Sequence, residues 1–488
     1  MSGLSTALNY AVAGLRVTSA QTALVSRNIS YANDPDYVRK HAALTTLPGG
    51  AISVASYNRS ADKRLLDKLL DTTSSAAGKQ VGLDALARLS ATIGDPESDG
   101  SITALVAKLQ ESLQAYEADP SSATLGANAF QRAANLARGL NAATAAVQDV
   151  RAGADAEMTA SVARINSLLE QFKVVNDAVV RGAGTPADLT DSLDQRDRIL
   201  KELSEEIGIR TITRANNDVA IYTDSGVTLF ETNPRSVTMA PTGVFDPTVT
   251  GNAVFIDGVK ITGIPSAMPA RTGKLHALAE IRDRITVTYQ AQLDEVARGL
   301  IETFAERDPS AVNPDATGLF TWVGGPGIPA SGAAVTGLAN LIAVSALADP
   351  SQGGNPYLIR DGGFNGAAYI ANATGAAGFQ QRIAQLISGF DVDRAFDGAA
   401  QIGTLASLKA FSATASGWVE AKRQAADQAL YFDIALKSRA SEALLRKTGV
   451  NIDEEMTALL DLEKAYQASS KVIAAVDGMI QTLLDVVN

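Results

Sequence analysis

Hydrophobic and small residues recur at alternating spacings of four and three near the start of the chain. The series comprises Leu4, Leu8, Ala11, Leu15, Thr18, Thr22, Val25 and Ile29. This spacing is typical of the seam of a coiled coil and predicts one long helix. The sequence YANDPDY follows and ends the predicted helix, because a proline disfavours helical geometry at the residue before it.

The end of the chain carries a similar stripe and predicts a second amphipathic helix. Gly449 can end the preceding helix, and Asn451 with Glu454 three residues later has the spacing of a capping box. The predicted seam comprises Ile452, Met456, Leu459, Leu462, Tyr466, Ile473, Val476, Ile480 and Leu483. An ordinary helix pair within one chain would give the same pattern, so periodicity alone leaves the partner of this stripe open.

The middle of the chain changes its period twice. Residues 60–206 are predicted to be mostly helical, with breaks at GDPESDG and DPSSATLG. After Gly208, the segment IRTITRANNDVAIYTDSGVTLFE alternates apolar and polar residues between turn signals, and NAVFIDGVKITG continues this theme. Both segments predict short antiparallel strands. Helix returns at residues 273–307.

Residues 308–380 are rich in Gly, Ala, Pro and Asn and predict irregular loops. From about Ile383 we expect helix to the end of the chain, with one interruption at KTGVN. The predicted fold class is mainly α with a smaller β part. The predicted domains are a terminal coiled-coil inner domain (1–45 with 450–488), a helical rod domain (46–208, 273–307 and 381–449), a small β region (209–272) and an irregular outer insertion (308–380).

The overall charge limits the classes of partner. The net charge of −11 argues against a nucleic-acid partner, which needs a basic face. The charged stretch DQRDRILKELSEE mixes both signs, which is typical of a solvated helix face. No apolar run reaches the roughly 18 residues needed to span a membrane. The first basic residue after Met1 is Arg16, so we expect no secretory signal peptide.

Candidate catalytic and metal-binding residues are scarce. The chain has no cysteine, which excludes disulfides and thiolate sites, and its two histidines, His41 and His276, stand alone. GGPGIP matches no phosphate-binding loop, and DVDRAFDG places Ala395 and Phe396 where a calcium loop needs a ligand and a glycine. We therefore expect no enzyme activity, metal or cofactor, and no deep pocket of clustered ionisable groups in residues 210–380.

The two ends together resemble those of the bacterial flagellar axial proteins. In SRNISYANDPDYVRK, the residues Asn28, Asn33, Pro35 and Tyr37 match the family's turn motif, whereas Asp36 stands where the family usually has glycine. If that position needs a positive φ, aspartate would adopt it at some cost. The tail from Asn451 is similar to the family's C-terminal signature. Within the family, SLDQRDRILKELSEEIGI and TGKLHALAEIRDRITVTYQAQLDEVARGLIETFAERD are most similar to the hook-associated proteins.

The resemblance implies a structural, non-enzymatic protein at the junction of hook and filament, outside the cell. Such proteins are exported unfolded by the flagellar type III apparatus and assemble as a homopolymeric ring. The implied partners are further copies of the chain, hook protein, hook-associated protein 3 and an export chaperone on the C-terminal region, with no nucleic acid and no membrane. The two terminal stripes should then face each other and neighbouring subunits. The absence of cysteine suits such export.

Three alternatives are weighed against this interpretation. The chain could be another axial component, such as a hook or distal-rod protein. It could be a secreted enzyme or effector carried on axial-type termini, which would need an active site in residues 210–380. It could also be a cytosolic coiled-coil scaffold, with helical termini in the isolated chain. We expect instead that the termini are disordered or protease-sensitive in the monomer and become ordered on assembly.

Overall fold

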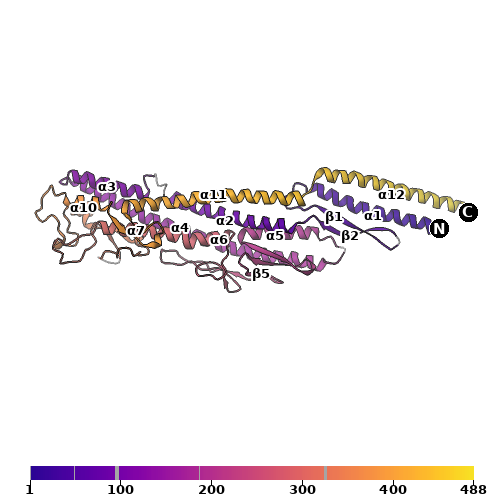
Figure 1. Cartoon of the computed structure of the whole chain (residues 1–488), viewed down its shortest axis with the longest axis horizontal. Coiled ribbons are helices and arrows are strands. Elements are labelled where there is room, and N and C mark those ends of the chain that lie inside the picture. Colours follow the sequence, from indigo (N-terminus) through magenta and orange to yellow (C-terminus); the bar gives the residue numbers. More distant parts are fainter. Residues whose placement is uncertain (1, 49, 94–97, 186, 324–326, 488) are drawn as a thin grey trace.

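The computed structural model describes residues 2–48, 50–93, 98–185, 187–323 and 327–487. The chain forms a long rod that begins and ends at the same tip (Figure 1). Helix α1 (Ser2–Ser30) leaves this tip, and α12 (Ile452–Val487) returns to it alongside α1. The structure is 61% helical with small sheets, which confirms the predicted fold class.

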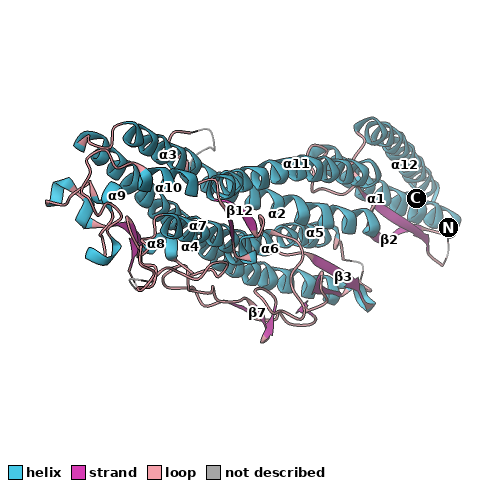
Figure 2. Ribbon diagram, turned by 60° about the vertical axis from the view of Figure 1, so that its left-hand side comes forward, coloured by secondary structure: helices cyan, strands magenta, loops and turns pink. Residues whose placement is uncertain are grey.

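A β-hairpin lies beside the terminal helix pair (Figures 1 and 2). Strands β1 (Lys40–Thr46) and β2 (Ile52–Arg59) pair antiparallel, with Lys40 opposite Arg59. Sequence analysis assigned no strand here. The segments KHAALTT and ISVASYNR carry few large apolar residues, and neither strand buries every second side chain as a half-buried strand would.

The rest of the rod is a body of long helices. They are α2 (Lys63–Ile93), α3 (Ile102–Ala118), α4 (Ala123–Gly182), α5 (Thr190–Glu206), α6 (Lys274–Glu280), α7 (Thr286–Thr303), α10 (Gln381–Gly389) and α11 (Leu408–Thr448). The helix break predicted at DPSSATLG is confirmed, because α3 ends at Ala118 and α4 begins after Ser122. The Ser122 hydroxyl caps α4 by accepting a hydrogen bond from the Leu125 amide. Helix α11 ends at Thr448, directly before the predicted stop at Gly449.

Two hydrophobic cores follow each other along the body, and α4 contributes to both. The core farther from the termini packs α3, α7, α10 and the start of α11 against the first half of α4, and contains Leu109, Leu136, Leu300 and Phe390. The core nearer the termini packs α2, α5 and α6 against the second half of α4, and contains Leu168, Phe172, Leu203, Ile221 and Phe230. The body therefore carries its own packed interior.

The predicted strands after Gly208 are confirmed as two small antiparallel sheets. One has the order β3 (Ile209–Thr213), β4 (Val219–Thr223), β5 (Thr228–Phe230), and the other has the order β6 (Val237–Thr238), β7 (Phe255–Ile256), β8 (Val259–Lys260). The first sheet packs on α4 through Phe230, whose ring meets Phe172 edge to face at 4.9 Å between centroids. Aromatic pairs favour this geometry.

The helix predicted at residues 273–307 is interrupted and ends four residues early. A π-helical turn, Ile281–Ile285, separates α6 from α7, which ends at Thr303. The turn holds the fully buried Arg282, whose guanidinium donates to Asp155 (2.6 Å) and to Asp283 (2.8 Å). A buried guanidinium needs such partners, and π-helical turns are often found where a side chain has a special role.

Residues 308–380 contain short elements and pack into the body. They are β9 (Phe320–Trp322), α8 (Leu338–Leu341), β10 (Ile342–Val344) and α9 (Leu358–Asp361), with 3₁₀ turns at Ala346–Ala348, Pro350–Gln352 and Ala367–Tyr369. Leu319, Phe320, Leu338 and Ile359 are buried in the core farther from the termini. The segment is therefore irregular in its backbone, as its glycine content predicts. Its low charge is explained by the burial of several of its side chains in the core.

The helix expected to continue from residue 383 is wrong for residues 390–407. Helix α10 ends at Gly389, and β11 (Asp393–Ala395) pairs antiparallel with β12 (Leu405–Ser407) before α11 begins. Two residues in this connection, Gln401 (φ 57°) and Gly403 (φ 120°), have backbone conformations that a helix does not allow. Two further 3₁₀ turns, Ala215–Asn217 and Gly398–Ala400, complete the described elements. None of the described helices is long and apolar enough to cross a membrane.

Candidate functional site

The terminal helices pack along one seam of α12 that keeps the alternating spacing of four and three. Along this seam Glu455 and Val476 are buried, and Leu459, Leu462 and Ile473 are half-buried. Helix α1 lies alongside, and its buried apolar side chains are Ala11, Val17 and Leu24. A Cβ at Gly14 would lie 3.4 Å from Ser469 Oγ, so the two backbones approach closely there. The two helices thus bury a narrow strip of side chains between them.

The residues predicted for this seam fall into two groups. Half-buried or buried are Leu4, Leu8, Leu15, Val25, Ile29, Leu459, Leu462, Ile473, Val476 and Ile480. Ile452, Met456 and Tyr466 are instead 45–48% exposed. The side chain of Leu483 lies outside the described part of the chain. Contact of any of these residues with a neighbouring subunit stays a prediction.

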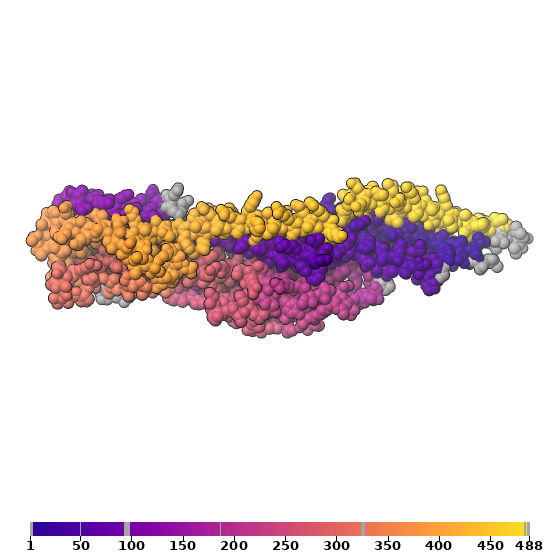
Figure 3. All heavy atoms as spheres, viewed as in Figure 1, coloured from indigo at the N-terminus to yellow at the C-terminus, as the bar shows by residue number. Residues whose placement is uncertain are grey.

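The exposed residues belong to a set of large apolar side chains on the solvent-facing sides of α12. It comprises Ile452, Met456, Leu460, Tyr466, Val472 and Met479, and we call it the outer stripe. Figure 3 shows α12 along the edge of the rod with no other segment over it in this view. Single exposed apolar side chains are common, but several large ones on one helix indicate a contact surface. Sequence analysis named three of them, Ile452, Met456 and Tyr466, as seam residues.

Asn28 joins α1, the hairpin and α12 at the inner end of the helix pair. This buried side chain accepts hydrogen bonds from Tyr37 Oη (2.8 Å) and the Lys40 amide (3.1 Å). It donates to the Lys40 carbonyl (2.9 Å) and to Glu455 Oε2 (3.0 Å). Both donors and both acceptor sites of the amide are therefore used. The turn motif predicted from sequence is thus the structural centre of this end of the molecule.

Glu455 links this centre to the body. Its carboxylate is buried and also accepts a hydrogen bond from Arg39 Nε at 2.6 Å. The Arg39 amide donates to the carbonyl of Thr448, at the end of α11. We call the set Asn28, Tyr37, Arg39, Lys40 and Glu455 the polar junction. It fixes α12 against α1 by directional bonds.

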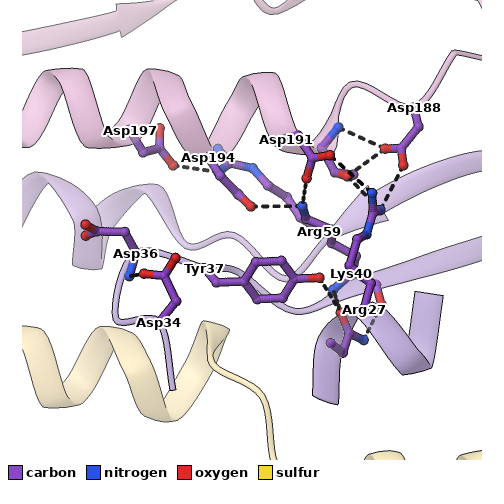
Figure 4. Close-up of polar contacts among 12 residues, drawn as sticks. Arg27, Asp34, Asp36, Tyr37, Lys40, Arg59, Asp188, Asp191, Asp194 and Asp197 are labelled. Atoms are coloured by element: carbon purple, nitrogen blue, oxygen red, sulfur yellow. Dashed lines mark hydrogen bonds and ion pairs between the residues drawn. The ribbon is translucent and has the colours of Figure 1, made fainter. Parts of the chain in front are cut away.

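Four aspartates beside or on α5 face three cations from α1 and the hairpin (Figure 4). Arg27 pairs with Asp188 (2.8 Å) and Asp191, Lys40 pairs with Asp191 and Asp194, and Arg59 pairs with Asp194 (3.0 Å) and Asp197 (2.7 Å). The aspartates recur every third residue, which places them along one side of α5. This acidic ridge binds the terminal unit to the body.

Burial sets the protonation behaviour of this ridge. Desolvation raises the pKa of Asp194, although Lys40 and Arg59 oppose the shift. At Asp188 burial acts in the same direction, but hydrogen bonds from Thr190 and Arg27 prevail and lower the pKa of the carboxyl. Burial also raises the pKa of the Tyr37 hydroxyl. Loss of any one cation would leave a carboxylate with poor access to water.

One expectation about this region is wrong. The charged segment of α5 is not a solvated face, since Asp194, Arg196 and Glu206 are buried against their partners. Asp36 is not among the residues with positive φ; instead its carboxylate pairs with Lys201 (3.0 Å) and Arg198 (3.4 Å) of α5. Aspartate at this position therefore adds a contact that glycine could not make. Asn33 and Pro35, the other motif residues, are exposed at the turn.

The described residues offer no group of three or more His, Asp and Glu side chains that could hold a metal ion. The expectation of no deep pocket with clustered ionisable groups within residues 210–380 stays a prediction. A pocket of about 730 Å³ at the border of that region is lined by Glu302, Arg307, Arg382, Asp393 and Arg394. Its chemistry is considered below.

Comparison with known proteins found similarities for both the body and the C-terminal helix. Residues 86–317 match the helical domain of the flagellar hook-associated protein FlgK. Residues 442–486 match the C-terminal region of the flagellar basal body rod FlgEFG proteins. Flagellar hook-associated protein 1 of Salmonella typhimurium is 24% identical over 328 residues, which cover 64% of this chain and 58% of that protein. The chain is therefore similar to the flagellar hook-associated proteins, both in its body and at its C-terminal helix.

Other hook-associated proteins show a similar relationship. Flagellar hook-associated protein 1 of Escherichia coli K12 is 22% identical over 343 residues, which cover 67% of this chain and 61% of that protein. The solved flagellar hook junction protein FlgK from Burkholderia pseudomallei aligns with a TM-score of 0.43 and 21% identity, over 52% of this chain and 46% of that one. The chain thus spans about three fifths of the curated relatives it matches.

The hook-associated protein family consists of structural flagellar proteins and is not an enzyme family. The similarity to these proteins confirms the resemblance found in the sequence. The matched segments overlap the described site at two points. The FlgK helical domain includes the acidic ridge of α5, and the rod-protein match includes Glu455 and the outer stripe.

Proposed function

We propose that this chain joins the hook to the filament of the bacterial flagellum, as a homopolymeric ring that assembles after type III export. The observation that carries the proposal is the outer stripe of α12, found in a chain that is similar to the hook-associated proteins. A helix that buries one face in its own chain and leaves large apolar side chains exposed on its other sides is suited to receive neighbouring helices.

The outer stripe supplies the free energy for assembly. Its members are 45–55% exposed, so neighbouring helices could still remove much of their surface from water. Complete burial of one large apolar side chain contributes about 1.5–3 kcal/mol, and partial burial contributes less. Six such residues repeated around a ring would hold neighbouring copies together. A ring needs a heterologous contact, in which each copy presents two different surfaces.

The polar junction and the acidic ridge give the ring its geometry. Asn28 and Glu455 hold the terminal helices together, and Arg59 holds the hairpin to α5. A helix pair that swung freely on the body would lose orientational entropy on assembly. Once the pair is ordered, its fixed orientation on the body therefore favours a regular assembly.

The proposed partners follow from this position. They are further copies of the chain, hook protein on one side, hook-associated protein 3 on the other, and a chaperone that covers the C-terminal region before export. The proposed location is outside the cell. A chain without cysteine can pass the export channel and fold beyond it with no thiol chemistry.

A deletion strain tests the proposal against the alternatives. Removal of the gene from a motile host should leave intact hooks without filaments and should release filament protein into the medium. Loss of the hooks would indicate a hook or distal-rod component instead. Normal filaments would contradict any axial role and would favour a secreted effector or a cytosolic scaffold.

Complementation of that strain tests the outer stripe. The double variant Leu460→Asp, Val472→Asp should be exported but should not restore filaments, because two carboxylates would have to be buried between subunits. Val174→Asp is the matched control, since Val174 is 69% exposed on α4 of the body. Restoration of filaments by the double variant would show that the outer stripe is not the assembly surface.

A further inference from the structure

A pocket of about 730 Å³ lies between the end of α7, α10 and β11. Helix α10 is at the tip of the rod opposite the termini (Figure 1). The lining includes amides and hydroxyls from Gln381, Gln385 and Ser388 and a half-buried aromatic ring from Phe379. Its size suits a small ligand, and its polar lining differs from the apolar pockets that most drug-like molecules prefer.

Arg382 on α10 lines this pocket and lacks the hydrogen bonds that a buried guanidinium requires. Its residue is only 8% exposed, and among the described residues its Nε has no hydrogen-bond partner. The nearest carboxylate oxygen, Glu306 Oε1, lies 3.8 Å from Nη2, which is beyond hydrogen-bond range. A guanidinium has five N–H donors, and burying them without acceptors is costly.

Glu306 does not depend on Arg382 for its hydrogen bonds. Its carboxylate accepts from the amides of Gly363 (2.7 Å), Phe364 (3.1 Å) and Asn365 (2.9 Å). Arg382 balances the charge of this carboxylate, but its donors remain available to the pocket. Burial lowers the pKa of the Arg382 guanidinium, and Glu306 opposes that shift.

Arg360, another buried arginine, shows how such a group is normally satisfied in this chain. It donates two hydrogen bonds to Asp361 (2.7 and 2.8 Å) and two to the carbonyls of Pro120 (2.8 Å) and Ala377 (2.9 Å). The contrast with Arg382 cannot be explained by burial, because the two residues are 7% and 8% exposed. Arg382 differs by facing a pocket.

The other charged groups of the lining leave room for an anion. Arg394 donates to the Gly299 carbonyl, yet its Nε also lacks a partner among the described residues. Arg307 is exposed and pairs with Asp315 outside the pocket lining. The two lining carboxylates are Glu302, which already accepts from Arg298 at 2.8 Å, and Asp393. Arg382 and Arg394 therefore each keep an Nε donor without a hydrogen-bond partner among the described residues.

We propose that this pocket binds a small oxyanion, a carboxylate or a phosphate group, with Arg382 as its main ligand. A planar guanidinium binds either group through two parallel hydrogen bonds. Gln381, Gln385 and Ser388 supply donors and acceptors for polar groups next to the anion. The proposal is independent of the junction function, since it concerns the opposite tip of the rod.

Calorimetric titration of the purified full-length chain tests the site. The probes are inorganic phosphate, glucuronate and, as the uncharged match to glucuronate, glucose. We expect binding of at least one anion and none of glucose; the anion that binds identifies the natural class as phosphate-like or carboxylate-like. Absence of binding by both anions up to tens of millimolar, or equal binding of glucose, would overturn the proposal.

Variants of the pocket separate binding from folding. Arg382→Met should weaken anion binding by at least about tenfold, the loss expected for a charge-assisted pair, whereas Arg382→Lys should keep part of it. Arg446→Met, at an 83% exposed side chain on α11, is the control and should bind as the native chain does. Unchanged binding by Arg382→Met would overturn the assignment.

A further variant guards against a folding defect in Arg382→Met. Gln385→Glu places a carboxylate at an exposed position of the lining without touching the core. It should leave the thermal unfolding midpoint unchanged and should weaken anion binding several-fold through repulsion. Equal affinity in this variant and in the native chain would place the bound anion elsewhere.

Discussion

The terminal helix pair and the body differ in how many of their side chains are buried within the chain. Helix α3 of the body has 17 residues and buries seven of them. Helix α12 has 36 residues, and among its described side chains only Glu455 and Val476 are buried. The same chain therefore contains a unit stabilised by its own core and a unit that leaves apolar surface for a partner.

The difference shows that two units of similar composition can bury very different fractions of their apolar side chains. Both units are helical, and both are rich in aliphatic residues. In the body, β-sheets and the 308–380 segment cover the apolar faces of α4 and α7. In the terminal pair, α1 covers one face of α12, and the hairpin contacts α1. What is missing at α12 is a third layer, which neighbouring subunits would provide.

The largest expected effect is on the core of the body. Phe172→Ala removes a fully buried ring that packs on Phe230, and it should lower the free energy of unfolding by about 3–5 kcal/mol. Urea unfolding of the purified chain, followed by circular dichroism, measures it. Phe432→Ala, at a 61% exposed residue of α11, is the control and should change stability by less than about 0.5 kcal/mol. Similar values for the two variants would contradict the comparison.

The next effect concerns the polar junction. Asn28→Ala leaves the Glu455 carboxylate and the Tyr37 hydroxyl without their shared partner, which should cost the terminal unit about 1–3 kcal/mol. Limited proteolysis should then cut the terminal helices faster than in the native chain, while the body unfolds at the same temperature. Asn33→Ala, at an exposed turn position, is the control and should be cut at the native rate.

The junction prediction also bears on the state of the free chain. If native chain and Asn28→Ala lose both ends at the same high rate, the junction forms only on assembly. That outcome would support the expectation that the termini are disordered in the monomer.

A further effect should appear in the pH dependence of the body. Burial raises the pKa of Asp294 from its usual value near 4 to about 6, although hydrogen bonds from the Ala339 and Gly337 amides and from Gln290 oppose the shift. The folded state then binds a proton more tightly than the unfolded state, so stability falls as the pH rises from about 4 to 6. Asp294→Asn should remove this fall. An unchanged difference in unfolding midpoint between pH 4 and pH 6.5 would show that Asp294 ionises normally.

The smallest effect is expected at the outer stripe of the free chain. Leu460 is 55% exposed, so Leu460→Ala should change the stability of the monomer by less than about 0.5 kcal/mol. Assembly should respond more strongly, because each copy would then lose part of an interface. Analytical ultracentrifugation under assembling conditions measures this second effect. A large loss of stability in the monomer would mean that Leu460 is already covered.

Much of the fold followed from the sequence because the relevant signals are local. Breaks such as DPSSATLG and KTGVN act through proline, glycine and caps, and the strands after Gly208 follow a period of two. The hairpin at residues 40–59 was not predicted, because its strands carry few large apolar residues. The strands β11 and β12 escaped because Gln401 and Gly403 turn the chain at positions where helix composition continues.

The site was predictable only in part, and for a related reason. Asn28 and Tyr37 were found through the motif, yet their link to Glu455 spans 427 residues of sequence. The aspartates at 188, 191, 194 and 197 carried a visible three-residue spacing, but their partners Arg27, Lys40 and Arg59 lie in other elements. Sequence spacing gives a face of a helix, and the tertiary fold decides what that face meets.

The satisfied amide of Asn28 has a mechanical consequence. An apolar seam is nearly indifferent to sliding, because a shift of one heptad, about 10.5 Å along a helix, again sets apolar residues against apolar residues. The hydrogen bonds from Asn28 to Glu455 and to the Lys40 backbone do not survive such a shift. Under axial load the polar junction would resist sliding of α12 along α1. The apolar seam excludes water from the helix pair, and the hydrogen bonds of Asn28 set its register.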